Sequence, residues 1–332
     1  MKIKILVTGA TGYIGHQLAL TLAERGNEIH VLVRNPNSSN IPVHENIKVF
    51  HGDITNTQSI EVAIQGCSQV YHTAALVKIF DKDSSQFHKV NIHGTHNLLQ
   101  KAVEFGVEKF LFTSSCSVIG PSKGKPMGED DSRITSFDCD YDITKYEAEN
   151  LVKDYAEKGL FTVIVSPSKV FGYSCPENKV ISMNKVIHKF INGGHTFIPK
   201  PGDFVSNYCF IKDVVDGHIK AMEKGSSGEN YILGGENMSF LEFFNIVRTI
   251  SGTKAKIVEV PKFVVKMMAL LQWIQFYAFK KEPYITDESI KQIFCNKIFS
   301  SDKAIDNLGY QITPRREGLQ ETIHILKNQS HV

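Results

Sequence analysis

The feature that most constrains the fold is a glycine-rich segment, residues 8–15, with the sequence TGATGYIG. It follows a short apolar run rich in β-branched residues and opens a helix-like stretch, so it predicts a strand, a turn and a helix. Gly9 would let the chain turn off the strand, Gly12 would let backbone amides approach an anion, and Gly15 would let the helix pack closely on the sheet. Glycines at this spacing, between a first strand and a helix, indicate a site for the pyrophosphate of a dinucleotide.

Short apolar runs and helix-like stretches alternate along the first half of the chain. Such alternation predicts an α/β fold with a doubly wound parallel Rossmann sheet and helices on both faces. The expected strands are residues 3–7, 28–33, 47–50, 69–73, 109–113 and 162–165, and the expected helices are residues 13–25, 57–64, 87–105, 142–158 and 317–327. The later part is irregular and indicates a smaller mixed α/β substrate lobe. We expect residues 1–172 to form the NAD(P)-binding Rossmann domain, with 205–235 returning to it, and residues 173–204 and 236–332 to form the lobe.

Charge and cysteine content narrow the functional classes. The 332-residue chain has 37 Lys and Arg against 35 Asp and Glu, which argues against a nucleic-acid-binding protein, so small molecules are the expected partners. Six cysteines without a Cys-x-x-Cys pair indicate neither a disulfide framework nor a zinc site. His93 and His96 share a predicted helix face, but no acid or cysteine completes a metal site. The amino terminus lacks the apolar stretch of a signal peptide, and we expect a cytoplasmic protein.

One long apolar segment, residues 263–279, reads FVVKMMALLQWIQFYAF. A membrane-spanning helix needs about 20 apolar residues, so this segment is too short to be an integral membrane span. We expect a helix buried in the substrate lobe or in a dimer interface, and a peripheral membrane contact is the alternative.

The residues after the second expected strand bear on the choice between NAD and NADP. An acidic residue there would bind the ribose 2′-hydroxyl and repel a 2′-phosphate, but the sequence reads VRNP from residue 33. Arg34 can offer a planar set of donors to a phosphate or stack on adenine, which favours NADP. A solvated surface arginine is the alternative. After the third expected strand, Asp53, followed by Ile54, places a carboxylate where an adenine amino group could bind.

Tyr141 and Lys145 form a pair at the start of an expected helix, four residues apart and therefore on one face. A tyrosine with a pKa of about 10 transfers protons poorly at neutral pH, and a nearby ammonium favours its phenolate form. Lys145 would supply this charge while binding the nicotinamide ribose. Because a YxxxK spacing also arises by chance in helices, an exposed Tyr-Lys contact is the alternative.

Hydroxyl and thiol side chains cluster where the fifth expected strand ends, in the sequence TSSCSVIG at residues 113–120. Ligands of open α/β sheets bind beyond the carboxyl ends of the strands. We therefore expect Ser115 to hydrogen-bond a substrate oxygen that Tyr141 protonates. Cys116 could be a reactive thiol, but a buried small residue is the simpler interpretation.

Five motifs of the chain resemble the extended short-chain dehydrogenase/reductase superfamily, which includes the NAD-dependent epimerase/dehydratase family. They are TGATGYIG at residue 8, HTAA at 72, VNIHGTHNLL at 90, TSSCSVIG at 113 and YDITK at 141, with a looser match in FIKDV at 210. The resemblance implies an enzyme with Ser115, Tyr141 and Lys145 as catalytic residues and Asn91 helping to order a proton-relay water. The predicted cofactor-binding residues are Gly9, Thr11, Gly12, Tyr13, Ile14, Gly15, Arg34, Asp53, Ile54, Thr73, Ala74, Ala75, Tyr141, Lys145, Pro167 and Val170.

Within the superfamily the chain is similar to the dihydroflavonol reductase-like and 3-beta-hydroxysteroid dehydrogenase-like branch. Nucleotide-sugar enzymes of the group usually carry an Asn after the sixth strand and an Arg before the later motif, both serving the substrate diphosphate. This chain has Lys169 and Ser206 there. Dehydratases need an acidic pair after the active-site hydroxyl, where this chain has Cys116 and Ser117. The resemblance therefore implies an oxidoreductase and argues against a dehydratase.

The leading interpretation is an NADP-dependent carbonyl reductase or alcohol dehydrogenase that transfers hydride to or from a small, partly apolar substrate. An NAD-dependent nucleotide-sugar epimerase, with no net redox change, is the alternative. A non-catalytic dinucleotide sensor is disfavoured because the Ser, Tyr and Lys are all present. The resemblance also implies a homodimer formed through helices 87–105 and 142–158. The aromatic residues expected to favour an apolar ligand are Phe197, Phe204, Tyr208, Trp273 and Tyr277.

Overall fold

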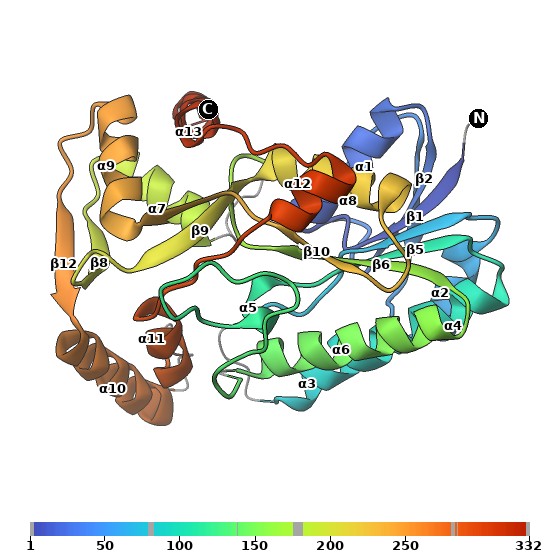
Figure 1. Ribbon diagram of the computed structural model, residues 1–332, viewed down its shortest axis with the longest axis horizontal. Coiled ribbons are helices and arrows are strands. Elements are labelled where there is room, and N and C mark those ends of the chain that lie inside the picture. Colours follow the sequence, from blue (N-terminus) through green and yellow to red (C-terminus); the bar gives the residue numbers. More distant parts are fainter. Residues whose placement is uncertain are drawn as a thin grey trace.

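A parallel sheet of seven strands, in the order β10-β6-β5-β4-β1-β2-β3, forms the centre of the protein (Figure 1). The structure is a computed structural model that describes residues 3–78, 83–137, 139–174, 182–279, 283 and 285–329. The strands are β1 (Lys4–Thr8), β2 (Glu28–Val33), β3 (Ile47–His51), β4 (Gln69–His72), β5 (Lys109–Thr113), β6 (Phe161–Pro167) and β10 (Asn230–Leu233). Successive strands run outward from β1 in one direction and from β4 in the other, which confirms the predicted doubly wound α/β fold.

Helices cover both faces of this sheet. In Figure 1, α1, α8 and α12 lie on one side and α2, α4 and α6 on the other. The helical segments are α1 (Tyr13–Glu24), α2 (Thr57–Ile64), α3 (Ser85–Phe87), the π-helical η1 (His88–His93), α4 (Gly94–Glu104), α5 (Cys116–Ile119), α6 (Asp140–Glu157), α7 (Ser182–Ile191), α8 (Ile211–Lys224), α9 (Phe240–Ser251), α10 (Lys262–Phe279), α11 (Asp287–Ile293), α12 (Asp302–Leu308) and α13 (Arg315–Gln329). Ile5 and Val7 of β1 belong to one apolar cluster and Leu6 to the other. Because both faces are buried, the central strands read as continuous apolar runs.

The segments after β6 build a smaller part of mixed structure. β7 (Lys169–Phe171), β9 (Val205–Phe210) and β11 (Glu236–Ser239) form a three-stranded sheet, in which β7 is parallel and β11 antiparallel to β9. β8 (Thr196–Lys200) and β12 (Ile257–Pro261) form a two-stranded parallel sheet. β10 returns to the central sheet beside β6. The chain therefore crosses between the two parts more than once.

The prediction of one continuous α-helix over residues 87–105 is wrong in its first half. The helix begins as α3, passes through the π-helical segment η1, and becomes regular only in α4. The Thr95 hydroxyl donates to the Asn91 carbonyl at 2.6 Å and contacts His72 Nε2 at 2.9 Å. π-helical segments are rare and often occur at functional sites, and this one carries Asn91, a predicted site residue.

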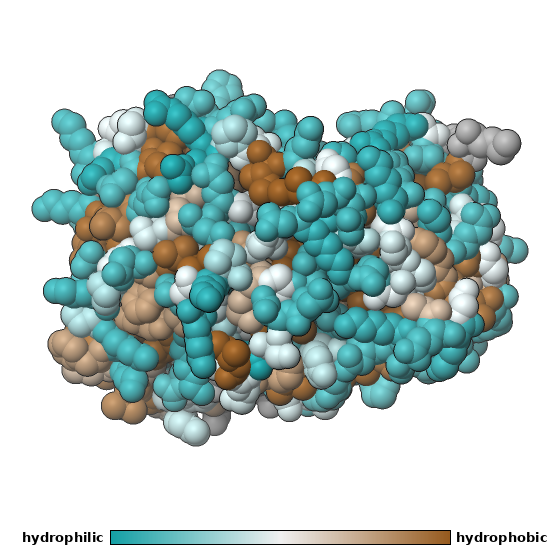
Figure 2. All heavy atoms as spheres, viewed as in Figure 1, coloured by the Kyte–Doolittle hydropathy of each residue, from teal (hydrophilic) through white to brown (hydrophobic). Residues whose placement is uncertain are grey.

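The apolar segment 263–279 forms a helix, α10, but the expectation that the substrate lobe buries this helix is wrong; its burial in a dimer interface and the alternative of a peripheral membrane contact stay predictions. Only Ala269 is buried in α10, because the helix packs mainly against α11 and β12 at one edge of the protein. The exposed large apolar residues of α10 are Phe263, Met267, Met268, Leu270, Leu271, Ile274, Tyr277 and Phe279. Figure 2 shows hydrophobic side chains at the lower left, where α10 lies. Within the described residues, no helix combines the length and apolar character needed to span a bilayer.

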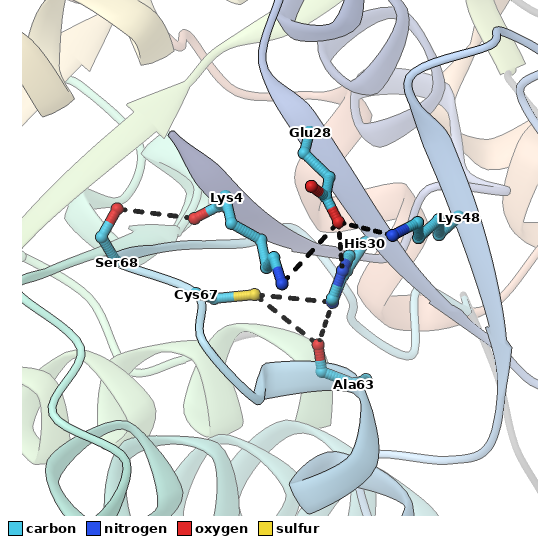
Figure 3. Close-up of polar contacts among 7 residues, drawn as sticks. All are labelled: Lys4, Glu28, His30, Lys48, Ala63, Cys67 and Ser68. Atoms are coloured by element: carbon cyan, nitrogen blue, oxygen red, sulfur yellow. Dashed lines mark hydrogen bonds and ion pairs between the residues drawn. The ribbon is translucent and has the colours of Figure 1, made fainter. Parts of the chain in front are cut away.

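Polar contacts connect β1, β2 and β3 where these strands begin (Figure 3). The Glu28 carboxylate accepts a hydrogen bond from Lys48 Nζ at 2.8 Å and lies 3.7 Å from Lys4 Nζ. His30 Nε2 lies 3.4 Å from the same carboxylate oxygen. The hydrogen bond from Lys48 is the main reason that the pKa of Glu28 falls from 4.5 to about 2. Glu28 is thus a charged link between three strands.

Replacing Glu28 with Gln is expected to lower stability at neutral pH but not in strong acid. A carboxyl group whose pKa is lower in the folded state stabilises the fold above its unfolded pKa, and this contribution is lost as the pH falls through the folded pKa. The difference in the free energy of unfolding between wild type and E28Q, measured with urea, should therefore shrink between pH 4.5 and about 2. Since the carboxylate is partly exposed, added salt should reduce the difference at neutral pH. A difference independent of pH would contradict this role.

Candidate active site

The predicted site residues meet at the carboxyl ends of the central strands. β1, β4, β5 and β6 are neighbours in the sheet, so the residues that follow them lie along one edge. Gly9 follows β1, Thr73 follows β4 and Ser115 lies just beyond β5. The Thr73 hydroxyl donates to the Thr8 carbonyl at 2.7 Å, which joins the ends of β1 and β4. Pro167 ends β6 and Val170 lies in β7 just beyond it.

The glycine loop lies so close to its neighbours that side chains would not fit. Gly9 has a φ of +77°, and a Cβ there would lie 2.6 Å from the backbone nitrogen of Ala74. A Cβ on Gly15 would lie 2.3 Å from the Gly9 carbonyl oxygen. Gly12 is the N-cap of α1, where no side chain caps the helix and no acid occupies its first turn. This backbone arrangement and the positive end of the helix dipole fit the pyrophosphate of a dinucleotide.

Tyr13 connects the glycine loop to the smaller part of the protein. Its hydroxyl donates to the Gly172 carbonyl and accepts a hydrogen bond from Asn184 Nδ2 at 3.2 Å. The Ser174 hydroxyl in turn donates to the Tyr13 carbonyl. The loop is therefore tied to α7 and to the residues that follow β7, a contact that the sequence did not predict. The neighbouring residues Thr11 and Ile14 are partly buried.

Arg34 and Asp53 lie just beyond the neighbouring strands β2 and β3. Arg34 is exposed, and its carbonyl lies 3.1 Å from His51 Nε2. The Asp53 carboxylate accepts a hydrogen bond from the Thr55 amide at 2.8 Å. Ile54 is only 6% exposed and belongs to the apolar core. The structure thus places a cation and a carboxylate at the edge where the adenosine half of a dinucleotide would lie.

Ser115 and Tyr141 meet at the end of β5. The Ser115 hydroxyl caps α5 by accepting a hydrogen bond from the Ser117 amide at 3.2 Å. It is also close enough to the Tyr141 phenol to affect the pKa of that group. Burial, and then the charge of Asp142, raises the pKa of Tyr141, while the Ser115 hydroxyl acts in the opposite direction. The phenol therefore holds its proton at neutral pH and is positioned to donate it.

The Lys145 ammonium is directed at the backbone of β5. Lys145 Nζ donates to the Thr113 carbonyl at 2.6 Å and lies 3.9 Å from the centre of the Phe112 ring. Burial lowers the pKa of Lys145 to about 7. Its charge is not among the causes that shift the pKa of Tyr141. The expectation that Lys145 favours the Tyr141 phenolate stays a prediction, and it requires the ammonium to turn toward the phenol.

Asn91 joins the cofactor-lining segment to α6. Its side-chain oxygen accepts from the Leu76 amide at 2.7 Å, and its side-chain nitrogen donates to the Thr144 hydroxyl at 3.0 Å. Thr144 precedes Lys145 and donates to the Asp140 carbonyl at 2.7 Å. Asn91 therefore holds the first turn of α6 against residues 73–76, which include the predicted residues Ala74 and Ala75.

Glu149 is a buried polar residue of the site that the sequence reasoning missed. It lies on α6, four residues after Lys145, and accepts a hydrogen bond from the Ser114 hydroxyl. Burial raises the pKa of Glu149. Extending the helical spacing from Tyr141 through Lys145 by one more turn would have identified it. It fixes α6 to the end of β5 and so maintains the distance between Ser115 and Tyr141.

A cavity of about 170 Å³ opens beside Ser115. The residues that line it are Ser115, Cys116, Ser117, Pro167, Ser168, Lys169, Ser206, Asn207, Lys297 and Phe299. The aromatic side chains expected to favour an apolar ligand lie elsewhere: Tyr208, for example, stacks on Phe243 with 4.3 Å between ring centres. Cys116 is 2% exposed and burial raises its pKa, which agrees with the interpretation as a buried small residue. Most of the residues that line the cavity carry polar side chains, but most of its lining surface is apolar.

Comparison with known proteins identifies the family. Residues 5–234 match the model of the NAD dependent epimerase/dehydratase family. The chain belongs to this family. The extended short-chain dehydrogenase/reductase resemblance is therefore confirmed, and the protein is an NAD(P)-dependent oxidoreductase of that type, acting on CH–OH groups.

The similarity of this family member to individual proteins extends along most of the chain. It is 28% identical over 323 residues to a 3-beta-hydroxysteroid dehydrogenase of Mycolicibacterium neoaurum, covering 93% of this chain and 87% of the relative. It is 29% identical over 328 residues to sterol demethylase protein B of Methylococcus capsulatus, covering 96% of each. The crystal structure of a UDP-glucose 4-epimerase from Thermotoga maritima has the same fold, with a TM-score of 0.83, 23% identity and coverage of 99% of this chain and 100% of that one.

Proposed function

We propose that the protein is an NADP-dependent reductase that interconverts a carbonyl and an alcohol on a small substrate. The observation that carries this proposal is that the Ser115 and Tyr141 side chains are neighbours at the end of β5, at the sheet edge where the glycine loop follows β1. A bound nicotinamide dinucleotide would supply or accept the hydride. Ser115 would hold the substrate oxygen, and Tyr141 would donate the proton that this oxygen requires in the reductive direction.

The surrounding residues have positioning and binding roles in this proposal. Lys145 would turn from the Thr113 carbonyl to bind the nicotinamide ribose, and its ammonium would then favour loss of the Tyr141 proton in the oxidative direction. Asn91 would hold α6 in place and support the proton path. The glycine loop and the first turn of α1 would bind the pyrophosphate. The smaller part of the protein would form the substrate lobe.

The preference for NADP rests on Arg34. No acid follows β2, and the exposed guanidinium of Arg34 can bind a 2′-phosphate through more than one hydrogen bond. The R34A variant is therefore expected to bind NADP(H) about tenfold to a hundredfold more weakly. Its affinity for NAD(H) should stay within about twofold of wild type, because no 2′-phosphate contact is lost. Calorimetric titration with all four nucleotides measures both values.

A matched control for Arg34 is Arg316, which is also exposed and lies on α13. R316A should leave both affinities unchanged. If R34A lost affinity for NADP(H) and NAD(H) equally, Arg34 would stack on adenine in both cofactors. That result would contradict the preference for NADP.

An NAD-dependent nucleotide-sugar epimerase is the second candidate. The serine, asparagine and lysine side chains among the residues that line the cavity favour it, because a sugar presents several hydroxyl groups to its site. The two functions differ in net redox change. Incubating the protein with NADPH and a panel of carbonyl compounds should consume the reduced nicotinamide absorbance in proportion to product. Inversion of UDP-glucose without a net change in that absorbance would replace the reductase by the epimerase.

The homodimer is part of this proposal and concerns α4 and α6, which lie side by side on one face of the sheet (Figure 1). Light scattering of the purified protein measures the assembly directly. A monomer at micromolar concentration would contradict the dimer without affecting the assignment of the reaction.

A further inference from the structure

Two lysines line the same cavity as Ser115. Lys169 lies at the start of β7, and Lys297 lies in the extended segment between α11 and α12. Lys169 Nζ donates to the Ser206 hydroxyl at 3.1 Å and lies 4.3 Å from the centre of the Phe240 ring. Both side chains line this one cavity, and the charge of Lys297 contributes to lowering the pKa of Lys169.

The backbone of β9 brings the two lysines together. Lys169 pairs with Tyr208 of β9, and Lys297 forms a β-bridge with Ser206, two residues earlier on the same strand. The Lys297 amide donates to the Val205 carbonyl at 2.8 Å, so the bridge is hydrogen-bonded. Residues two apart on a strand point to the same face of the sheet. The lysines are therefore placed by regular strand geometry.

No carboxylate among the described residues forms an ion pair with either lysine. The charge of Lys297 acts to lower the pKa of Asp142, but burial raises the pKa of that carboxyl and no ion pair joins the two. Burial, and then the charge of Lys297, lowers the pKa of Lys169 to about 7. Two positive charges that line one cavity, neither of them in an ion pair with a carboxylate, repel each other and are costly to remove from water. An anion bound in the cavity would reduce the repulsion between the two lysines and offset the cost of removing their charges from water.

We propose that Lys169 and Lys297 bind the carboxylate or phosphate of a small oxo or hydroxy compound whose reacting oxygen lies at Ser115. The position of the reacting oxygen rests on the function proposed above. A cavity of about 170 Å³ is smaller than the pockets of about 300–1,000 Å³ that enclose drug-sized ligands. The anionic group and the reacting carbon therefore belong to one compact molecule.

Binding of matched probes to the complex with oxidised cofactor tests this inference without turnover. The probes are levulinate with its methyl ester, and dihydroxyacetone phosphate with dihydroxyacetone, each titrated calorimetrically into protein saturated with NADP. At least one anion should bind about tenfold to a hundredfold more tightly than its neutral partner. A difference within the levulinate pair indicates a carboxylate ligand, and a difference within the dihydroxyacetone phosphate pair indicates a phosphate ligand.

The variants K169M and K297M should each lose most of this preference. Because Lys169 packs on the Phe240 ring and its loss could disturb folding, K297M provides a second, independent measurement. K297R keeps the charge and should retain the preference. K254M, which removes an exposed lysine outside the cavity, should bind all probes like wild type. Unchanged NADP affinity in every variant shows that the fold is intact.

The outcomes separate this inference from the proposed reaction. Anion binding that depends on the lysines, in a protein that transfers no hydride, would support the inference and end the reductase proposal. Equal binding of anionic and neutral probes, or binding of neither, would overturn the inference and leave the reductase open. Lysine-dependent binding of UDP-glucose in place of the small anions would also overturn it.

Discussion

The Y141F variant should lose about 100-fold to 10,000-fold in kcat, the range expected when a positioned proton donor is removed. Burial raises the pKa of Tyr141, so its phenol keeps its proton at neutral pH. Phenylalanine preserves the ring, so packing at the start of α6 should remain. The rate of nicotinamide oxidation with the best carbonyl substrate measures the loss, and calorimetry should show unchanged NADP binding within about twofold.

Tyr146 provides a matched control on the same helix, because it is 44% exposed. Y146F should react like wild type. If Y141F kept most of the wild-type kcat, another group would have to supply the proton and the assigned role of Tyr141 would be wrong.

Replacing Gly9 with Ala should destabilise the fold by about 2–5 kcal/mol and abolish dinucleotide binding. Part of this loss, about 1–2 kcal/mol, comes from forcing a residue with a Cβ into a positive φ. A further part, about 1–3 kcal/mol, comes from crowding, because the new Cβ would lie 2.6 Å from the Ala74 backbone nitrogen. Urea unfolding measures stability and calorimetry measures NADP binding.

The variant G26A separates the conformational contribution from the contribution of crowding. Gly26 has a φ of +87°, but a Cβ there would meet nothing within 4 Å. G26A should therefore show only the conformational part, about 1–2 kcal/mol, and should bind NADP normally. If G9A were no less stable than G26A, the close approach of the loop to Ala74 would not hold in solution.

The sequence predicted the features that depend on local pattern. Continuous apolar runs identified the strands buried on both faces, and the glycine spacing identified the loop after β1. The position of Ser115 followed from the rule that ligands bind beyond the carboxyl ends of parallel strands. Tyr141 followed from its spacing to Lys145 and from the family resemblance.

The features that the sequence did not reveal depend on contacts between distant segments. Lys297 reaches the cavity through a bridge to Ser206, and no local pattern around residue 297 indicates it. The π-helical turn at Asn91 lies in a segment, residues 87–105, whose sequence predicted one continuous helix. The exposure of α10 depends on how little of the chain packs against it, whereas its composition resembles that of a buried helix.

The small sheet of β7, β9 and β11 has an evolutionary consequence. Lys169, Ser206 and Lys297 come from this sheet and its neighbouring segment, whereas Ser115 and Tyr141 are fixed by the central sheet and α6. Substitutions at Lys169, Ser206 or Lys297 could change which substrates bind, while Ser115 and Tyr141 continue to support hydride transfer. A lineage built on this architecture could diversify its substrates through a few point changes, without first rebuilding the machinery that moves the proton.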